Sequence, residues 1–293
     1  MFAVGLMLLA SGVSAESASP TLEIQVHARA LAPGEPMRVV VTSTEPLRTL
    51  RGSFLSRDLS FAPESAGQQG DEAWTAWSIV DLDASAGETR LTVSSTTVGG
   101  RETSGATAVT IVKKAFPTET LKVDEKYVAP PKEVQARIAR EQAALGAVYA
   151  RRTPALPAAA PFQRPVSGEP TSIFGLRRVF NGTPKAPHPG LDLRAAPGTR
   201  VLCSGPGSVA LARDLYFSGN TVIVDHGGGL FTIYAHLSRI DVKEGAAVTA
   251  GRMLGLSGAT GRVTGPHLHW GGKVGNLPFD PTALLDPALF APG

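Results

Sequence analysis

Short runs of alternating apolar and polar residues, each ended by a turn-rich stretch, recur along much of this 293-residue chain. Examples are "TLEIQVHA", "MRVVVTS" and "TRLTVSST", with "APGEP" and "SAGE" among the turns. Side chains alternate between the two faces of a strand, so such runs predict short strands with one buried face. The 32 Gly and 23 Pro also favour turns over long helices. We therefore expect a mainly β protein.

These patterns divide the chain into parts. Residues 16–116 predict a small β-sandwich of immunoglobulin-like type. It contains no catalytic cluster, and its single His27 is interpreted as structural because one imidazole alone makes neither a metal site nor a dyad. Residues 117–161 predict a linker with one amphipathic helix, followed by a Pro/Ala-rich stretch. Residues 162–293 return to strands and Gly turns, which predict an antiparallel sheet or open barrel.

The first 15 residues, "MFAVGLMLLASGVSA", predict a signal peptide because an apolar stretch ends in the small residues Val13-Ser14-Ala15. The absence of an early Lys or Arg departs from the usual signal-peptide pattern, and a short hydrophobic N-terminal element is the alternative. Because the stretch is too short to span a bilayer, we expect export to the periplasm or cell envelope without a stable membrane span. Cys203 is the only cysteine, which excludes an internal disulfide. We interpret it as a buried strand residue.

The charge is mildly basic and unevenly distributed. The chain has a formal charge of +3, and residues 160–293 contain 12 Lys+Arg against 8 Asp+Glu. No basic run with interleaved aromatic residues occurs, so we expect no nucleic-acid partner. A weakly cationic half would suit a polyanionic cell wall, but an ordinary solvated surface is the simpler interpretation.

Five of the six histidines lie in the last 132 residues: His188, His226, His236, His267 and His269. On a strand, His267 and His269 would share a face, and so would His188 and Asp192 if their segment is extended. Two imidazoles and a carboxylate are a usual ligand set for catalytic zinc, which lowers the pKa of bound water to roughly 7. Structural histidines are the alternative. No HExxH motif supplies a Glu base, so the remaining histidines are the candidates for proton transfer.

The segments "HPGLDL", "IYAHLSRIDVKEG", "GLSGATGRVTGPHLHW" and "FDP" occur in this order between about residues 170 and 285. Together they resemble the LytM/lysostaphin-type zinc metallopeptidases, family M23. The resemblance implies that His188, Asp192 and His269 bind Zn²⁺ and that His236 and His267 are the catalytic histidines. It also matches His226 to a histidine outside the metal site, which we interpret as structural.

The sequence departs from the family pattern after "HLH". Many members follow this motif with an aromatic residue and Glu, whereas here Gly271 follows Trp270. The departure concerns the support of His269 and removes no ligand. Tyr216 and Phe217, in "RDLYFSGN", either line a substrate groove or pack as ordinary aromatic residues.

The resemblance implies an exported zinc metalloendopeptidase that hydrolyses peptide cross-links of bacterial peptidoglycan, with stem peptides as substrates. One alternative is a non-catalytic binding protein of the same fold that regulates other wall hydrolases. Another is a structural envelope protein with an incidental zinc. D-alanyl and glycyl cross-links both remain open, with composition and predicted export favouring the former. Residues 1–159 are expected to position or restrain the enzyme, with envelope proteins as candidate partners, and residues 160–293 alone are expected to stay active.

Overall fold

The computed structural model describes residues 21–63, 73–122, 130–154 and 161–291, and the predicted signal peptide at 1–15 lies outside them. Strands dominate these residues, and one α-helix accompanies them, which confirms the mainly β prediction. None of the helices in the described part of the chain is long and apolar enough to cross a membrane. The boundaries of the predicted domains stay predictions.

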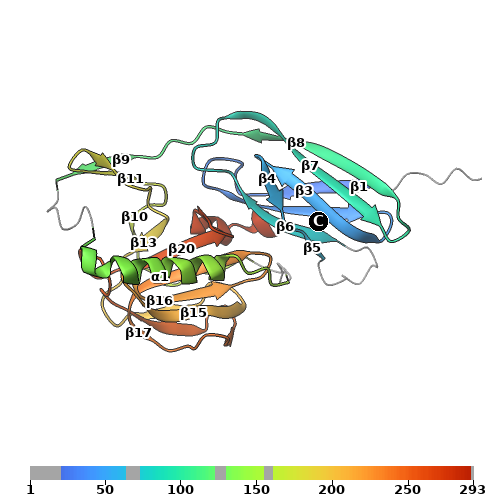
Figure 1. The fold of residues 1–293 in the computed structure, drawn as a ribbon. Coiled ribbons are helices and arrows are strands. Elements are labelled where there is room, and N and C mark those ends of the chain that lie inside the picture. The colour runs from blue at the N-terminus through green and yellow to red at the C-terminus, as the bar shows by residue number, and fades with distance from the viewer. Residues whose placement is uncertain (1–20, 64–72, 123–129, 155–160, 292–293) are drawn as a thin grey trace, which may run out of the picture.

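The first half forms two four-stranded sheets packed face to face, which we call the front sandwich (Figure 1). Its strands are β1 (Leu22–His27), β2 (Pro36–Ser43), β3 (Leu47–Phe54), β4 (Arg57–Leu59), β5 (Ala62–Pro63), β6 (Trp74–Ile79), β7 (Gly87–Thr97) and β8 (Glu102–Ile111). The sheet orders are β1-β2-β6-β5 and β4-β3-β7-β8. Both sheets send apolar residues into one core, including Met37, Phe54 and Leu91. The alternation read from the sequence therefore faces this core.

The described residues 112–122 and 130–154, here together called the connecting segment, contain β9 (Thr118–Leu121) and α1 (Lys132–Tyr149). The helix buries Ile138 and Val148, as its apolar spacing predicts, and packs against the outer face of the second half (Figure 1). The strand was not predicted. It joins β11 (Arg177–Phe180) in a small three-stranded sheet and runs parallel to it.

The second half is built on one open ten-stranded sheet, here called the rear sheet. Its path is β10-β13-β20-β17-β16-β15-β18, with β14, β19 and β21 paired beside it. The elements of this half are β10 (Pro170–Ser172), β11 (Arg177–Phe180), β12 (Thr183–Pro184), β13 (Gly190–Leu193), β14 (Arg200–Leu202), β15 (Gly207–Leu215), β16 (Gly219–Asp225), β17 (Leu230–Ile240), β18 (Ala247–Val248), β19 (Met253–Ser257), β20 (Leu268–Val274), β21 (Leu277–Phe279) and the 3₁₀ helices η2 (Pro281–Leu285) and η3 (Pro287–Phe290).

Both faces of the rear sheet are covered. One core contains Tyr234 and Trp270, both fully buried, and the other lies under α1 and contains Phe231. Cys203 is buried as expected, and burial raises the pKa of its thiol to about 11. The strands in the middle of this sheet therefore have little contact with water, and polar side chains there need protein partners.

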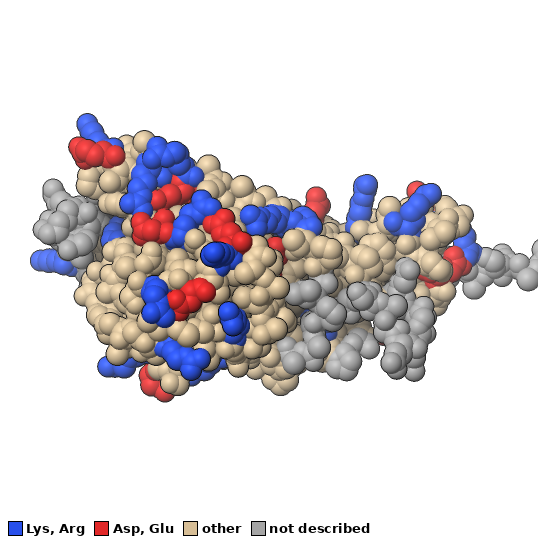
Figure 2. Space-filling view, turned by 90° about the horizontal axis from the view of Figure 1, so that it is seen from below, with Lys and Arg blue, Asp and Glu red and all other residues tan. Residues whose placement is uncertain are grey.

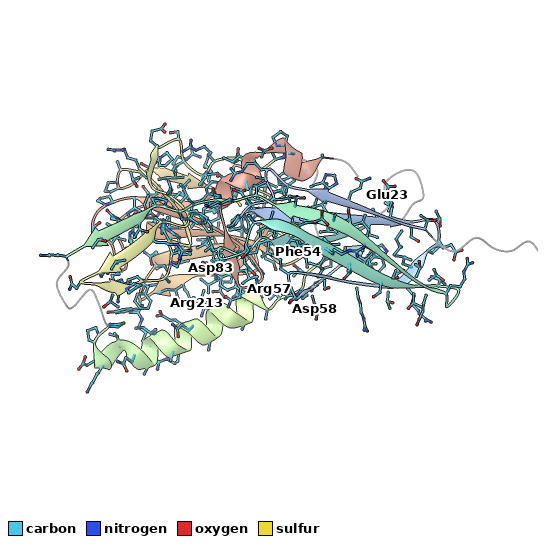
Figure 3. All side chains as sticks on the ribbon, turned by 90° about the horizontal axis from the view of Figure 1, so that it is seen from above. Glu23, Phe54, Arg57, Asp58, Asp83 and Arg213 are labelled. Carbon is cyan, nitrogen blue, oxygen red and sulfur yellow. The ribbon has the colours of Figure 1, made fainter. Side chains whose placement is uncertain are left out.

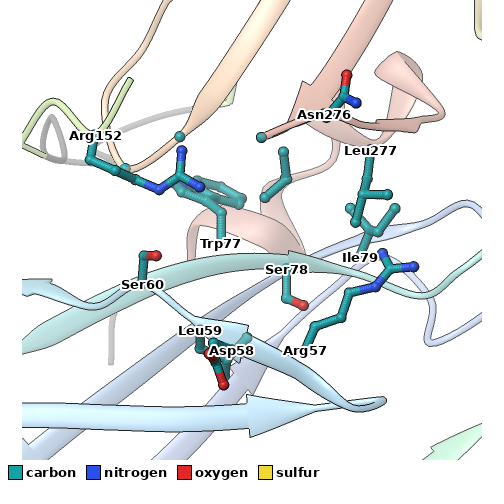
Figure 4. A pocket seen from close by; sticks show the side chains of 14 residues that line it. Arg57, Asp58, Leu59, Ser60, Trp77, Ser78, Ile79, Arg152, Asn276 and Leu277 are labelled. Carbon is teal, nitrogen blue, oxygen red and sulfur yellow. The ribbon is translucent and has the colours of Figure 1, made fainter. Parts of the chain in front are cut away.

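The front sandwich packs against the rear sheet through an apolar cluster that includes Trp77, Leu230 and Phe290. A cavity of about 170 Å³ remains at this contact, lined by Trp77, Arg57 and Arg152 among others (Figure 4). On the face shown in Figure 2, acidic and basic side chains lie interspersed. Some opposite charges on the surface form ion pairs, for example Arg213 with Glu244.

Candidate metal centre

Strand pairing brings the predicted metal ligands together. β13 and β20 are antiparallel neighbours, and their register places Asp192 directly opposite His269. His188 lies two residues before β13, and its backbone N–H donates to the carbonyl of Leu176. The three side chains thus come from one loop and two adjacent strands. The sequence predicted that they share a site, and the sheet register supplies the reason.

The three ligand atoms lie close to one another. Asp192 Oδ1 is 3.1 Å from His188 Nε2 and 2.8 Å from His269 Nδ1, and the two ring nitrogens are 3.2 Å apart. In a tetrahedral site with metal–ligand bonds of 2.0–2.1 Å, ligand atoms are separated by roughly 3.3–3.4 Å. The spacing therefore fits a small divalent cation after shifts of a few tenths of an ångström.

The protonation of His188 supports the same conclusion. Its Nδ1 lies 2.9 Å from the carbonyl oxygen of Ile173, which can only accept, so Nδ1 carries the hydrogen. When the ring is neutral, Nε2 therefore directs a lone pair toward Asp192 and His269, and a proton added on Nε2 would be donated to Asp192 Oδ1. Three electron-pair donors this close need positive charge between them, from a proton or a metal ion. Burial alone would raise the pKa of Asp192, but hydrogen bonds with His188 and His269 hold it well below its usual range.

The two predicted catalytic histidines lie beside this cluster. His267 Nε2 is 3.6 Å from Asp192 Oδ1, and the rings of His236 and His267 are 4.8 Å apart between centroids. His236 donates its Nδ1–H to the backbone carbonyl of Thr260 at 2.9 Å, and His267 donates its Nδ1–H to the carbonyl of Gly265 at 2.9 Å. Both rings therefore keep a lone pair on Nε2 when neutral.

His236 has two further properties of a functional residue. Burial lowers its pKa to about 4, so the ring is neutral near pH 7 and can accept a proton. Its backbone φ is +63°, a left-handed conformation that non-glycine residues adopt rarely and mostly where the surroundings enforce it.

Comparisons with known proteins agree with this geometry. The model of Peptidase family M23 matches residues 186–281, which contain all five site residues. A crystal structure of an assigned M23 peptidase from Pseudomonas aeruginosa aligns with 87% of this chain and 95% of its own, with a TM-score of 0.64 and 30% identity. The chain belongs to peptidase family M23.

Two curated M23 relatives match over the rear part. The peptidoglycan DD-endopeptidase ShyA of Vibrio cholerae is 48% identical over 101 residues, which are 34% of this chain and 24% of ShyA. The cell division protein DipM of Caulobacter vibrioides is 39% identical over 132 residues, 45% of this chain and 21% of DipM. The chain therefore matches about a quarter or less of the length of these relatives.

His226 is not part of the M23 site cluster. It is buried, with Nδ1 at 2.6 Å from the carbonyl of Pro206 and Nε2 at 2.7 Å from the hydroxyl of Thr232. Its ring packs against Phe162 with centroids 4.7 Å apart. Burial lowers its pKa to about 4. These contacts suit the structural role that the sequence predicted.

The sequence analysis did not identify Gly190 as a site residue. A Cβ placed on Gly190 would lie 2.7 Å from Cε1 and 2.8 Å from Nε2 of His269, so a side chain there would displace the ring. The register places Gly190 opposite Gly271, the position where the M23 pattern often has Glu. The ring of His269 thus rests against glycine backbone. Glycine in the quoted motif "HPGLDL" was the available signal for this close approach.

Proposed function

We propose that this M23 chain is an exported zinc metalloendopeptidase that hydrolyses peptide cross-links of peptidoglycan. The observation that carries the proposal is the convergence of three ligand atoms, within 3.2 Å of one another, beside two imidazoles anchored through Nδ1. His188 Nε2, Asp192 Oδ1 and His269 Nδ1 would hold the metal. Bound there, zinc supplies Lewis acidity, which makes water a nucleophile at neutral pH and polarises an amide carbonyl.

The other two histidines then divide the proton chemistry. Neutral His236 takes a proton from water through Nε2, because burial keeps the ring uncharged and Thr260 fixes its tautomer. His236 would then pass this proton to the leaving amine, and His267, anchored at Nδ1 by Gly265, would carry a proton on Nε2 and donate it as a hydrogen bond to the oxyanion of the tetrahedral intermediate. Burial of His188 and His236 limits the access of bulk water to these two rings.

For the substrate, we propose D-alanyl cross-links rather than glycine bridges. Three of the relatives, ShyA, ShyB and ShyC of Vibrio cholerae, are named peptidoglycan DD-endopeptidases, and a Neisseria meningitidis relative is named a DD-carboxypeptidase/endopeptidase. Action on the wall also requires export, which the apolar residues 1–15 would direct.

Digestion of purified peptidoglycan tests the proposal. The full-length zinc-loaded chain should convert cross-linked muropeptides to monomers, seen by mass analysis, and a chelator should stop the reaction until zinc is restored. Cleavage should fall at the D-alanyl bond in directly cross-linked walls. Zinc-loaded protein that binds the wall without releasing any muropeptide would instead support the non-catalytic regulator.

A further inference from the structure

The connecting segment touches both walls of the metal centre. The first wall is residues 172–176, beside His188, and the second is the turn 216–219, beside His236. We propose that the connecting segment is a clasp that positions both walls, and that Phe116 and Glu141 are its principal positioning residues. This inference rests on the proposed function for its kinetic consequences, although the contacts themselves are independent of it.

Phe116 holds the first wall. Its ring meets Phe174 edge-on at 6.2 Å between centroids. A Cβ placed on Gly175 would lie 2.2 Å from the Phe116 ring, so this ring rests directly on the wall backbone. That backbone is tied to the metal ligand, because the N–H of Gly175 donates to the carbonyl of His188 and the N–H of His188 donates to Leu176. Phe116 is therefore connected to the proposed ligand His188 through a single intervening residue, Gly175.

Strand β9 reinforces the same wall. It pairs in parallel with β11, which places Glu119 opposite Arg178, and their side chains are 3.5 Å apart. Arg178 also donates to the hydroxyl of Ser172 at 2.9 Å. The next residue, Ile173, supplies the carbonyl that fixes the tautomer of His188. Strand β9 is thus connected to His188 through the side chains of Arg178 and Ser172 and the backbone carbonyl of Ile173.

Glu141 of α1 holds the second wall. Its carboxylate accepts the backbone N–H of Tyr216 at 2.8 Å and Arg137 Nε at 2.6 Å. Two residues farther along the turn, the carbonyl of Ser218 accepts the backbone N–H of His236 at 2.9 Å. Figure 3 shows α1 running along the rear sheet. One helical carboxylate therefore restrains the turn that supports the left-handed backbone of His236.

The two contacts act on different histidines of the proposed centre, Phe116 through the wall bonded to His188 and Glu141 through the turn bonded to His236. No described residue of the connecting segment forms a hydrogen bond or ion pair with a ligand atom of the site. Loss of Glu141 should therefore leave the three metal ligands in place and loosen the turn that supports His236, and small displacements of catalytic groups lower the rate strongly. The clasp thus predicts that removal of Glu141 lowers kcat without loss of zinc.

A matched pair of variants tests this inference in the full-length chain. Glu244 is a matched control for Glu141, because each carboxylate accepts one backbone N–H and one arginine side chain. The donors to Glu244 are the backbone N–H of Ala212 and the side chain of Arg213, both on β15 and away from the turn 216–219. Glu141→Ala should lower kcat by roughly ten- to hundredfold, the effect of losing a charge-assisted hydrogen bond in a positioned site. Glu244→Ala should stay within about twofold of wild type. Glu141→Gln keeps an acceptor oxygen and should recover part of the loss.

Hydrogen exchange of the metal-free proteins gives a readout that does not need activity. Glu141→Ala should speed exchange at Tyr216 and His236, and Phe116→Leu should do so at Gly175 and His188, with the fold retained. If wild type hydrolyses nothing while these amides respond, the clasp stands and the proposed function fails. If wild type is active and Glu141→Ala matches Glu244→Ala in kcat and exchange, the clasp is wrong.

Discussion

The front sandwich and the rear sheet are built from similar short strands but differ in what covers them. In β7 of the front sandwich, Leu91 and Val93 are buried while Arg90 and Ser94 are exposed. In the rear sheet, β16 is buried along almost its whole length because the core lies on one face and α1 on the other. A polar side chain on the outer face of the β4-β3-β7-β8 sheet can be hydrated, whereas one in the middle of the rear sheet must be paired inside the protein.

This difference bears on where the proposed metal centre lies. His188, Asp192 and His269 are buried or half-buried, and each lies within hydrogen-bonding distance of the other two. Grouping polar side chains away from water lowers the stability of the fold through their desolvation, and such clusters are typical of sites that bind a ligand or metal ion. Substitutions in the proposed centre should therefore cost far more than substitutions on the exposed face of the front sandwich.

Removal of a proposed ligand should have the largest effect. Asp192→Ala deletes the oxygen that both ligand histidines face, so zinc retention should fall by more than the roughly 10–100-fold caused by loss of a supporting partner. Hydrolysis should disappear. Atomic emission and muropeptide release measure the two quantities. Asp241→Ala, at an exposed surface pair with Arg239, is the control and should retain both. Full zinc in Asp192→Ala would contradict the ligand assignment.

His236→Ala should be the next largest change. It removes a neutral imidazole beside the cluster and leaves the three ligands untouched, so hydrolysis should fall by about 10²–10⁴ while zinc content stays at the wild-type level. The rate of muropeptide release and the zinc content, measured on the same samples of His236→Ala and wild type, test this prediction. A variant with undiminished turnover would show that His236 is not needed for proton transfer.

The buried His226 should make the rear half sensitive to acid. Its pKa is lowered from 6.5 to about 4 by burial, so between these values the unfolded chain binds a proton that the folded chain does not. This contribution to stability is complete above pH 6.5 and is lost as pH falls toward 4, by about 2 kcal/mol at pH 5.

Urea unfolding at pH 7 and pH 5 measures this contribution, as the free energy of unfolding of the wild-type protein and of His226→Gln, both made metal-free with a chelator. The stability difference between the two proteins should narrow by about 2 kcal/mol on acidification. Identical changes in both would mean that His226 is protonated equally in the folded and unfolded states.

The smallest effect is expected from a substitution on the exposed face of the β4-β3-β7-β8 sheet of the front sandwich. Ser94→Ala should change stability by less than about 0.5 kcal/mol and hydrolysis by less than about twofold, because Ser94 is exposed to water. The shallow hollow that Ser94 shares with Arg51 and Ser104 makes this a useful check. A large loss on intact peptidoglycan, but not on soluble muropeptides, would show that this face binds the wall.

Much of the site was predictable from local sequence. The even spacing of His267 and His269, and of His188 and Asp192, indicated shared faces, and the structure brings all four side chains together. The spacing could not reveal that Asp192 lies opposite His269, because register depends on pairing between strands 77 residues apart. The carbonyls of Ile173, Thr260 and Gly265 were likewise invisible, since any residue supplies a carbonyl.

The connecting segment was the least predictable part of the fold. Its helix followed from apolar spacing, but β9 has only four residues, and its partner β11 lies almost 60 residues later. Local propensity carries little information about such a parallel pairing. The expectation that residues 160–293 alone stay active remains a prediction, and the contacts of Phe116 and Glu141 argue against it.

The central claim is that His267 and His269 share a site but have different roles. Zinc content measured beside turnover in His267→Ala and His269→Ala tests it most directly. We predict that His269→Ala loses zinc and all hydrolysis, since its Nδ1 faces Asp192, whereas His267→Ala keeps stoichiometric zinc and loses about 10²–10⁴ in rate. Zinc lost from His267→Ala but retained by His269→Ala would reverse the roles, and full activity in both variants would contradict the account.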